Sequence, residues 1–439
     1  MSPARETALR ALIAFRREGT WPDLYLKRAS RRLSTDDAAL AARLTYGVLE
    51  NRAYLDFLIG AFSNRPMEKL TPQVLDALRL AAYQLVFLQR IPQSAAVNEA
   101  VEQVKKAGNP GAGAFANGLL RSLERRLSDL PQVPREDPLT YLSTRYSHPR
   151  WFVGKMRKRL GDEGCEALLQ ADNAPAPVTA RVNTLKTDRA ALLRRLEERG
   201  CPARVHPDLE NALILEQPGA ALRTGLMDEG LLYIQDAASQ LCVEALDPRP
   251  GETVLDLCAA PGGKALLAAQ KMKNTGEIVA LELHPHRVEL MKKNAVRMGV
   301  TCLRAVAGDA STFCEAPESV DAVLCDVPCS GMGVIRKKPD VRYKDGDSIK
   351  ALPPLQLAIL KNGAACLRPG GRLVYSTCTL LREENEAVIE AFLQENSGFA
   401  REAFSLPGIG ACAEGQITLW PQIHGTDGFF IAKLRKIRG

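Results

Sequence analysis

Apolar side chains recur at helical spacing through the first 130 residues of the chain. They fall every three or four positions, as at Ala8, Leu12 and Phe15, and prolines and a glycine-containing loop separate successive stretches. This spacing places the apolar side chains on one face of a helix, and the prolines separate one helix from the next. The pattern predicts an all-helical domain over residues 1–130.

A proline-rich stretch at residues 131–140 breaks this pattern and predicts a linker. Beyond the linker, the patterns are short and mixed as far as residue 232. Residues 180–200 predict a strand, a turn and a helix, and residues 212–217 predict another strand. We expect a small α+β module over residues 141–232.

From residue 233 onward, apolar strands alternate with amphipathic helices. The expected strands cover residues 253–258, 277–283, 303–308, 322–327, 371–377 and 428–434, and the expected helices cover residues 263–273, 285–299, 354–367 and 383–394. This alternation predicts a doubly wound α/β domain over residues 233–439, with a parallel sheet covered by helices on both faces. Such a sheet binds its ligand at the carboxyl ends of its strands.

The composition is that of a folded soluble protein, with 46% hydrophobic and 25% charged residues. No apolar run has the length of a signal-peptide core or a membrane span, which predicts a cytoplasmic protein. In that compartment the 11 cysteines are expected to be free thiols. They form no CxxC pair and the five histidines do not cluster with them, so we predict no metal site.

The net charge of +7 is unevenly distributed along the chain. Residues 1–130 hold 19 Lys or Arg against 13 Asp or Glu, a net charge of +6, which leaves +1 for the remainder. A basic helical domain beside a nearly neutral main body favours an anionic partner that is reached through the helical domain. The alternative is that these charges lie on the solvated faces of surface helices.

The sequence DLCAAPGGKA joins the first strand of the α/β domain directly to a helix. Small residues let the backbone lie close to a ligand, and the free amides of a helix N-terminus are available to it. A tight turn that needs glycines is the structural alternative. The motif is neither GxGxxG nor a Walker loop, so a phosphate-binding role is disfavoured. The candidate cofactor-binding residues are Cys258, Ala259, Ala260, Pro261, Gly262, Gly263 and Lys264.

Three acidic residues follow successive strands of the predicted sheet. Glu282 ends the second strand, where a carboxylate can accept hydrogen bonds from the ribose hydroxyls of a nucleoside cofactor. Asp309 follows the third strand, where it could meet an adenine amino group. Asp326 ends the fourth strand. Each alone is more often a solvated strand end, but together they define an arc the size of a nucleoside.

Two cysteines follow the fourth and fifth strands. Cys329 lies in DVPCSGMG and Cys378 lies in YSTCTL, so both thiols are expected at the edge of the sheet that carries Asp326. A single cysteine is more often a core residue. Two thiols beside a carboxylate favour a catalytic role over a role as core residues. Enzymes that methylate an exocyclic amine commonly carry Asp/Asn-Pro-Pro-aromatic here, and the aromatic residue is missing.

The segment GVIRKKPDVRYK, at residues 333–344, has five basic residues and one acidic residue. It could bind the phosphates that flank a target base. A solvated loop is the alternative. The candidate RNA-binding residues are Arg287, Arg336, Lys337, Lys338 and Arg342.

These motifs together resemble a known family. The segments DLCAAPGGKA, DVPCSGMG, IRKKPDVR and YSTCTL look like those of the RNA cytosine-C5 methyltransferases of the NOL/NSUN type. RVNTLK and QDAASQL resemble the segment before the catalytic fold of that family. VNEAVEQVKKAG and FANGLLRSL resemble the end of the NusB-like RNA-binding domain, which matches the bacterial ribosomal RNA branch, the Sun/Fmu proteins.

The resemblance implies a fold and a reaction. It implies a NusB-like all-α N-terminal domain, an RNA-binding α+β module and a Rossmann-like class I methyltransferase domain that uses S-adenosylmethionine. It gives Cys378 the attack on cytosine C6 and gives Cys329 the role of assisting release of the product. Asp326 would hydrogen-bond the ring. Lys264 or Arg382 could favour the thiolate of Cys378.

The same resemblance implies 16S ribosomal RNA as the substrate and a monomeric protein without a metal. Three alternatives stay open. A DNA cytosine-C5 methyltransferase would take Cys329 as its nucleophile. A non-catalytic RNA-binding factor would keep the fold and use the helical domain. An amine-methylating enzyme would modify N4.

Overall fold

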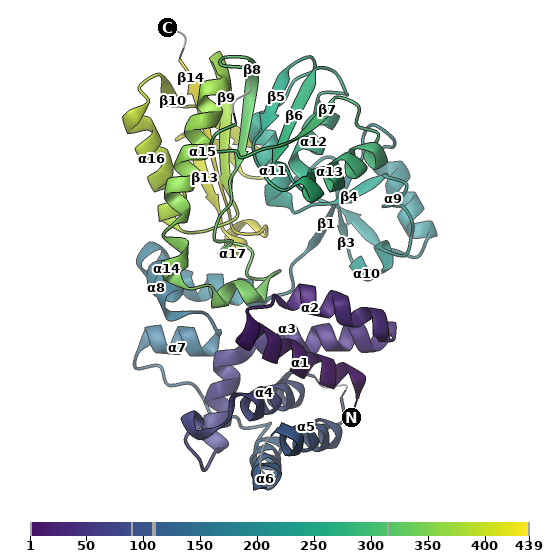
Figure 1. Cartoon of the computed structure of the whole chain (residues 1–439), viewed down its shortest axis with the longest axis vertical. Coiled ribbons are helices and arrows are strands. Elements are labelled where there is room, and N and C mark those ends of the chain that lie inside the picture. The colour runs from purple at the N-terminus through teal and green to yellow at the C-terminus, as the bar shows by residue number, and fades with distance from the viewer. Residues whose placement is uncertain (1, 89–90, 108–110, 314–315, 438–439) are drawn as a thin grey trace. The chain divides into compact units, whose positions relative to one another are not determined.

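The computed structural model describes residues 2–88, 91–107, 111–313 and 316–437 (Figure 1). The chain forms two compact units. The first unit comprises residues 1–173 together with 338–343, and the second unit comprises residues 174–337 and 344–439.

The first unit is all-helical, as the apolar spacing predicts. Its elements are α1 (Pro3–Glu18), α2 (Pro22–Ala29), η1 (Ser30–Arg32), α3 (Thr35–Phe62), η2 (Met67–Lys69), α4 (Pro72–Phe87), α5 (Gln93–Ala107), α6 (Gly111–Arg125), α7 (Pro138–Arg145), α8 (Arg150–Asn173) and η3 (Pro339–Tyr343). Helices α1, α2, α4 and α7 each begin at a proline, whose fixed φ suits the first helical position. The apolar faces of α1, α3, α4, α5 and α6 form a core that is rich in leucine, alanine and valine side chains.

The long helix α3 lies at the centre of this unit. Ser34 caps its N-terminus, because the Ser34 hydroxyl accepts a hydrogen bond from the Asp37 amide at 3.1 Å. Gly47 lets α4 approach closely, since a Cβ atom at this position would lie 1.9 Å from the Tyr83 ring. Leu44 and Ile59 are fully buried in the core that results.

The boundary of the helical unit lies further along the chain than the predicted linker. Helix α7 begins at Pro138, inside the stretch 131–140, and α7 and α8 belong to the first unit. The compact helical unit thus extends to residue 173, beyond the expected start of the α+β module at residue 141, and that expected start stays a prediction. The patterns were too short to assign these two helices to the helical unit.

The second unit begins with the expected small α+β module. Its antiparallel sheet has the order β2-β3-β1-β4, and its elements are β1 (Val178–Val182), α9 (Arg189–Glu198), β2 (Ala203–Val205), β3 (Ala212–Leu215), α10 (Pro218–Ala221) and β4 (Leu232–Ile234). Leu192 and Leu196 of α9 pack against Ala180 and Leu213 of the sheet.

The main sheet has the order β10-β14-β9-β8-β5-β6-β7, and β13 also pairs with β14. The strands are β5 (Thr253–Asp256), β6 (Glu277–Glu282), β7 (Leu303–Ala307), β8 (Val320–Asp326), β9 (Leu367–Thr377), β10 (Phe399–Arg401), β13 (Gln416–Leu419) and β14 (Phe429–Lys436). Strands β5 to β9 are parallel to one another, and β14 is antiparallel to β9. All six expected strands are present.

Helices cover both faces of the main sheet. One face carries α11 (Ala237–Leu246), α12 (Gly263–Lys271) and α13 (Pro285–Met298), and the other carries α15 (Leu352–Cys366) and α16 (Glu386–Glu395). Side chains alternate along each strand, so Leu324 points to the first face, and Val323 and Cys325 point to the second. This arrangement confirms the doubly wound fold. The remaining elements are a short hairpin of β11 (Phe404–Leu406) and β12 (Gly410–Cys412), and the short helices α14 (Gly346–Ile349), η4 (Arg382–Glu384) and α17 (Pro421–His424).

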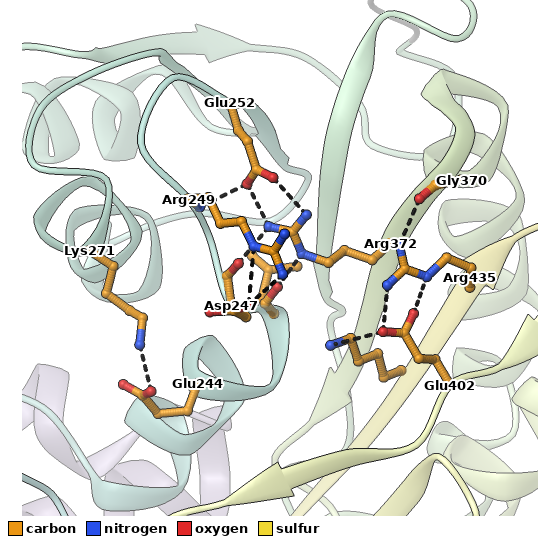
Figure 2. Close-up of polar contacts among 11 residues, drawn as sticks. Glu244, Asp247, Arg249, Glu252, Lys271, Gly370, Arg372, Glu402 and Arg435 are labelled. Atoms are coloured by element: carbon orange, nitrogen blue, oxygen red, sulfur yellow. Dashed lines mark hydrogen bonds and ion pairs between the residues drawn. The ribbon is translucent and has the colours of Figure 1, made fainter.

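Arginines hold the sheet toward the amino-terminal ends of its strands (Figure 2). Arg372 of β9 donates hydrogen bonds to the two carboxylate oxygens of Glu252 at 2.8 and 2.5 Å. Arg435 of β14 donates to the carbonyl of Gly370 at 2.7 Å and to the carboxylate of Glu402. These contacts tie β9 to the segment before β5 and to β14, at the end of the sheet opposite to the candidate site.

Candidate active site

The loop after β5 forms the floor of the candidate site. Gly262 has a φ of +102° and a Cβ at this position would lie 3.1 Å from Met291, so the turn requires glycine. The peptide bond between Ala260 and Pro261 is cis. Helix α12 starts at Gly263, and its first free amides face the loop. The local structure is the strand–turn–helix that DLCAAPGGKA predicts.

Four carboxylates gather around this loop. Burial is the largest cause of a raised pKa at Cys258, and the charges of Asp256, Asp326, Glu282 and Asp309 raise that pKa further. Three of these acids are the ones that the sequence singles out. Because they follow β5, β6, β7 and β8, the parallel order of the sheet brings them to one edge.

Glu282 and Asp309 differ in their surroundings. Glu282 is buried, accepts a hydrogen bond from the His284 amide at 3.0 Å and lies 3.2 Å from the Arg287 guanidinium. Asp309 is close to solvent, and hydrogen bonds from the hydroxyl and amide of Ser311 lower its pKa. Each acid therefore has polar neighbours, and the lowered pKa of Asp309 keeps that carboxylate ionised.

Asp326 is held on both of its oxygens. Ser376 donates a hydrogen bond to Oδ1 at 2.8 Å, and the Lys264 ammonium donates to Oδ2 at 2.6 Å. Burial is the largest single cause and would lower the pKa of Lys264, but the charge and hydrogen bond of Asp326 and the charges of Cys242 and Asp256 together outweigh it, and the pKa is raised. Lys264 therefore stays protonated, and Asp326 is fixed as its partner.

Asp256 is the buried acid behind this pair. Both of its carboxylate oxygens are buried without a hydrogen-bond partner. Burial, followed by the charge of Asp326, raises the pKa of Asp256 to about 7. A carboxylate in this state favours a cation or a hydrogen-bond donor that enters beside it.

A cavity of about 250 Å³ opens in front of these groups. It is lined by Asp256, Asp326 and Lys264, by the loop from Cys258 to Gly263, and by residues of the segment from Tyr233 to Ser239. Glu282, Asp309 and the two candidate thiols do not line it. The cavity therefore lies beside Asp256 and Asp326 and does not extend to the other two acids of this sheet edge.

The two candidate thiols meet beside this edge. The sulfur atoms of Cys329 and Cys378 are 3.2 Å apart, which is hydrogen-bond distance and too long for a disulfide. Cys329 follows β8 and Cys378 follows β9, and these neighbouring strands pair Asp326 with Ser376 at their ends. The sheet register therefore places both cysteine loops at the edge of the sheet where β8 ends at Asp326.

The contact between the two sulfurs bears on the pKa of Cys329. The hydrogen bond to Cys378 is the largest cause of a raised pKa at Cys329, and burial and the charges of Cys378 and Glu384 add to it. A raised pKa favours a protonated Cys329 thiol, which can donate to Cys378; at this distance either sulfur can be the donor. The arrangement distinguishes the two thiols, although both are partly buried.

A buried polar network holds the two cysteine loops together. Glu384 is fully buried and accepts hydrogen bonds from the Ser330 amide at 2.8 Å and the Gln356 side chain at 2.9 Å. The Ser330 hydroxyl lies 2.8 Å from that of Thr379. Asn385 donates to the Thr379 carbonyl at 3.0 Å. The residues that neighbour each thiol are thereby fixed to one another.

Comparison with known proteins agrees with this geometry. The family model described as "16S rRNA methyltransferase RsmB/F" matches residues 243–435 of the chain. The model of the "NusB family" matches residues 2–125. A ferredoxin-like domain of RsmF/B-like methyltransferases matches residues 148–221. "Probable ribosomal RNA small subunit methyltransferase B" from Bacillus subtilis is 40% identical, and the alignment covers 98% of each chain. The chain belongs to the RsmB/F methyltransferase family.

Two further relatives support this membership. "Probable ribosomal RNA small subunit methyltransferase B" from Synechocystis is 34% identical over 99% of this chain and 100% of the relative. The solved structure of a methyltransferase homologue from Pyrococcus horikoshii is 33% identical, with a TM-score of 0.60, over 69% of this chain and all of that one. The predicted NusB-like domain and methyltransferase fold are confirmed.

Two of the residues expected to bind RNA phosphates are committed elsewhere in this family member. Arg336 donates a hydrogen bond to Asp427 at 3.0 Å, and its side chain is 5% exposed. Lys337 donates to Asp236 at 2.5 Å and to Asp427 at 2.8 Å. These cations neutralise buried carboxylates, so the prediction that they bind phosphate is wrong for Arg336 and loses its support for Lys337.

Arg342 also contradicts the prediction of a phosphate contact. It is buried in the helical unit, where one guanidinium nitrogen donates to the carbonyls of Glu50 at 2.7 Å, Tyr146 at 3.1 Å and Ser147 at 3.3 Å. The other nitrogen donates to the Asn173 side chain at 2.5 Å. Its charge serves the fold of that unit, and the basic pattern alone could not reveal this.

The other expected cations have mixed outcomes. Lys338 is exposed. Arg287 is 42% exposed, and it contacts Glu282 and donates to the Ala260 carbonyl at 2.9 Å, which places it at the cofactor loop. Arg382 binds Glu390 at 2.8 Å and is 62% exposed, so the expectation that it favours the Cys378 thiolate loses its support.

Sequence reasoning missed Asp256, Arg181 and Glu384. Arg181 is fully buried, donates to the Gly263 carbonyl at 2.7 Å and lies over the Tyr233 ring. It belongs to RVNTLK, Asp256 opens DLCAAPGGKA, and Glu384 follows YSTCTL. Each of these residues lies in or next to a motif that the sequence analysis singled out, and this was the signal that could have found it. The residue type alone does not show that the charged side chain is buried.

The residues present fit S-adenosylmethionine. Its sulfonium and amino groups are cations, and the site supplies several carboxylates around one glycine-rich loop. The buried oxygens of Asp256, which have no hydrogen-bond partner, are available to a cationic group. Among the described residues, no group of His, Cys, Asp and Glu could hold a metal ion. No described helix is long and apolar enough to cross a membrane.

Proposed function

We propose that this protein transfers the methyl group of S-adenosylmethionine to C5 of a cytosine in small-subunit ribosomal RNA. The observation that carries the proposal is the contact between two thiols at the edge of the sheet. Cys329 and Cys378 lie 3.2 Å apart, and the strands that precede them end at Asp326 and Ser376. One thiol as acceptor and one as donor supply the two roles that this reaction needs.

The loop from Cys258 to Lys264, with Glu282 and Asp309, would hold the cofactor. Glu282 would accept hydrogen bonds from the ribose hydroxyls, and Asp309 would face the adenine. Asp256 lies at the inner end, where a cationic group would relieve its buried charge. When bound, the cofactor supplies an electrophilic methyl group.

Cys378 is the nucleophile in this proposal. Its sulfur accepts the hydrogen bond of Cys329, which favours a thiolate at Cys378. The thiolate adds to C6 of the cytosine, so a C6–S bond forms and the electrons of the C5–C6 double bond shift toward C5. The ring carbon becomes nucleophilic enough to accept a methyl group.

Asp326 positions the ring. Its carboxylate is fixed by Ser376 and Lys264, so it presents a defined acceptor to the exocyclic amine of the cytosine. A preorganised acceptor of this kind orients the ring toward the thiolate. Lys264 stays protonated beside it and keeps the local charge balanced.

Cys329 assists the release of the product. Once Cys378 is bonded to carbon, it is a neutral thioether and no longer accepts a proton from Cys329. Two of the causes that raise the pKa of Cys329 are then lost, which makes its thiolate accessible. Cys329 then gives its own proton to solvent, its thiolate takes the proton from C5, the C5–C6 double bond forms again, and Cys378 leaves as a thiolate.

The helical unit and the relatives support an RNA substrate. The relatives from Bacillus subtilis and Synechocystis are named small-subunit ribosomal RNA methyltransferases. Residues 1–130 carry a net charge of +6, which suits a polyanion. The target base must be unstacked to expose C6, so an RNA loop or a remodelled stem is the expected site.

Nucleoside analysis tests the proposal. The purified protein is incubated with S-adenosylmethionine and small-subunit ribosomal RNA, and the RNA is digested and examined by mass spectrometry. We expect 5-methylcytidine at a single position, which bisulfite sequencing then maps. N4-methylcytidine would contradict the proposal, as would an absence of both products together with no binding of S-adenosylmethionine by calorimetry.

A further inference from the structure

Arg181 is a buried cation for which the described part of the chain supplies no anion. It lies on β1 of the α+β module, its side chain is fully buried, and it forms no ion pair with any residue that the structure describes. Burial lowers the pKa of Arg181 to about 9, so the guanidinium is still protonated at neutral pH. Two of its nitrogens, Nε and Nη2, are buried without a hydrogen-bond partner among the described residues. A charge buried in this way is costly unless an anion joins it.

The third nitrogen of Arg181 binds the wall of the candidate cofactor cavity. Nη1 donates hydrogen bonds to the Gly263 carbonyl at 2.7 Å and to the Oε1 atom of Gln235. The guanidinium also lies over the Tyr233 ring, 5.2 Å from its centroid. All three partners line the cavity of about 250 Å³, and Arg181 itself does not line it. Arg181 therefore lies directly behind this wall and acts on the cavity through its partners.

The contact with Arg181 orients the side-chain amide of Gln235. Its oxygen accepts the hydrogen bond of Arg181, so its NH₂ group, which is a donor, points to the other side. A Cβ atom on Gly263 would lie 3.4 Å from the Nε2 atom of Gln235, which places that NH₂ group beside the first residue of α12. Helix α12 has no side-chain cap at this end, so its first amides are donors as well. The wall thus presents hydrogen-bond donors that suit an anion.

In the proposed function, this cavity receives the amino-acid end of the cofactor. Glu282 would bind the ribose and Asp309 would face the adenine, and the cavity does not extend to either acid. The amino-acid end carries a carboxylate and an ammonium, and the ammonium suits the unpartnered buried oxygens of Asp256. Of the described residues that line the cavity, Lys264 alone is basic, and its ammonium is bound to Asp326 at 2.6 Å. The cofactor carboxylate therefore needs another cation.

We propose that Arg181 is a positioning residue for the carboxylate of S-adenosylmethionine. The inference rests on the proposed function, because it takes that cofactor as the ligand. Arg181 holds Gln235 and the first turn of α12, so that their donors are available to the carboxylate. Its charge, which no described acid neutralises, also favours an anion in the cavity. The α+β module thereby supplies a determinant of cofactor binding to the methyltransferase domain.

A purely structural role explains less. Arg181 does join β1 to α12, and its contacts with Gly263 and Tyr233 stabilise that junction. A neutral side chain could fill the same space without the cost of burying a charge, and apolar replacement of buried charges is often neutral or stabilising. The buried charge is explained if its anion arrives with the cofactor.

The test pairs two ligands that differ only in the carboxylate. These are the demethylated cofactor, S-adenosylhomocysteine, and its decarboxylated form, in which hydrogen replaces the carboxylate. Calorimetry gives both dissociation constants for the full-length wild type and for Arg181→Met, which removes the charge, and Arg181→Lys, which restores it. Arg204→Met is the control, because Arg204 is an exposed residue of the same small sheet. Circular dichroism confirms that each variant is folded.

We expect Arg181→Met to bind S-adenosylhomocysteine at least about 10-fold more weakly, which is the effect of losing one charge-assisted hydrogen bond. Its binding of the decarboxylated ligand should change by about 2-fold or less, because that ligand has no group that needs the cation. Arg181→Lys should recover part of the lost preference, and Arg204→Met should change neither constant by more than about 2-fold. Equal weakening of both ligands by Arg181→Met would overturn the inference, because a structural role alone predicts that result.

Gln235→Glu is the second variant, and it decides the question if Arg181→Met does not fold. Glutamate has the shape of glutamine, but it gives Arg181 a carboxylate partner and removes the NH₂ donor from the wall. This variant should therefore show the same selective loss of S-adenosylhomocysteine binding with Arg181 still in place. An unchanged preference for the ligand with the carboxylate would overturn the inference.

The inference and the proposed function can fail separately. Formation of 5-methylcytidine by the wild-type protein, with equal weakening of both ligands by Arg181→Met, would refute the role of Arg181 alone. A selective loss of S-adenosylhomocysteine binding in Arg181→Met, with no 5-methylcytidine formed by the wild-type protein, would refute the proposed reaction alone.

Discussion

The sulfur atoms of Cys329 and Cys378 lie 3.2 Å apart, although 49 positions separate them in the sequence. The parallel pairing of β8 with β9 brings the two loops together, and Glu384 and Asn385 hold them there. The contact with Cys378 raises the pKa of Cys329, which favours a protonated thiol at Cys329. The relationship assigns different roles to two chemically identical side chains.

Replacement of the two cysteines should therefore have different effects. The Cys329→Ala protein should accumulate a covalent complex with RNA, because addition to C6 still occurs but release is impaired. The Cys378→Ala protein should form no complex and no 5-methylcytidine. Denaturing gel electrophoresis with labelled RNA in the presence of S-adenosylmethionine distinguishes the two. A complex with Cys378→Ala and none with Cys329→Ala would reverse the assignment, as expected for a DNA-type enzyme.

The buried charge of Glu384 should raise the pKa of the Cys329 thiol. Its buried charge is one cause of the raised pKa of Cys329, so Glu384→Gln should lower that pKa while keeping the hydrogen bond from Ser330. The pH dependence of alkylation, followed at the Cys329 peptide by mass spectrometry, measures the shift. Glu383→Gln is the matched control, since Glu383 is exposed. An unchanged or higher midpoint in Glu384→Gln would exclude this electrostatic effect.

Asp256 should make stability depend on pH. Its pKa is about 7 in the folded protein and about 3.8 ordinarily, so the folded state holds a proton that the unfolded state has lost between these values. Stability from this group is present at low pH and is lost as pH rises through 7. Asp256→Asn should remove this loss. Thermal unfolding without cofactor measures the difference between the midpoint of Asp256→Asn and that of the wild type. This difference should become more positive from pH 5 to pH 8. A difference that stays constant would contradict the raised pKa of Asp256.

Arg372 should be critical for the stability of the second unit. It is largely buried, and it donates to Glu252 and to the carbonyls of Leu246 and Asp247 at 2.5 and 2.6 Å (Figure 2). Arg372→Met removes the donor to both carbonyls and leaves the Glu252 carboxylate with the Arg249 amide alone, and it should lower the free energy of unfolding by about 3 kcal/mol. Urea denaturation measures the change.

The neighbouring pair of Arg249 and Asp247 provides the control for that measurement. The Arg249 side chain is 68% exposed, and its guanidinium lies 3.3 Å from the Asp247 carboxylate. An exposed pair contributes little, so Arg249→Met should change stability by less than about 0.5 kcal/mol. Comparable effects of the two substitutions would show that the buried contacts of Arg372 contribute no more than an exposed ion pair.

The sequence predicted the sheet and the edge that carries the site. Every expected strand of the α/β domain is present because buried parallel strands appear as short apolar runs, and the motifs follow those runs directly. Asp326, Cys329 and Cys378 were placed at one edge by that logic alone. The register of β8 and β9 supplied the distance between the thiols, which strand order does not give.

What the sequence could not predict was the partner of each charge. Arg336 and Arg342 look alike as basic residues in one segment, yet one binds Asp427 and the other is buried among carbonyl groups. The apolar patterns around α7 and α8 were too short to show which unit these helices pack against, so they did not define the boundary of the helical unit.

The most direct test of the account uses RNA in which cytosine is replaced by 5-fluorocytosine. Fluorine at C5 cannot be removed as a proton, so the covalent intermediate of the wild-type protein should persist. Digestion and mass spectrometry then identify the residue that carries the nucleotide. The account predicts attachment at Cys378 and methylation of the trapped base. Attachment at Cys329, or no covalent complex at all, would contradict it.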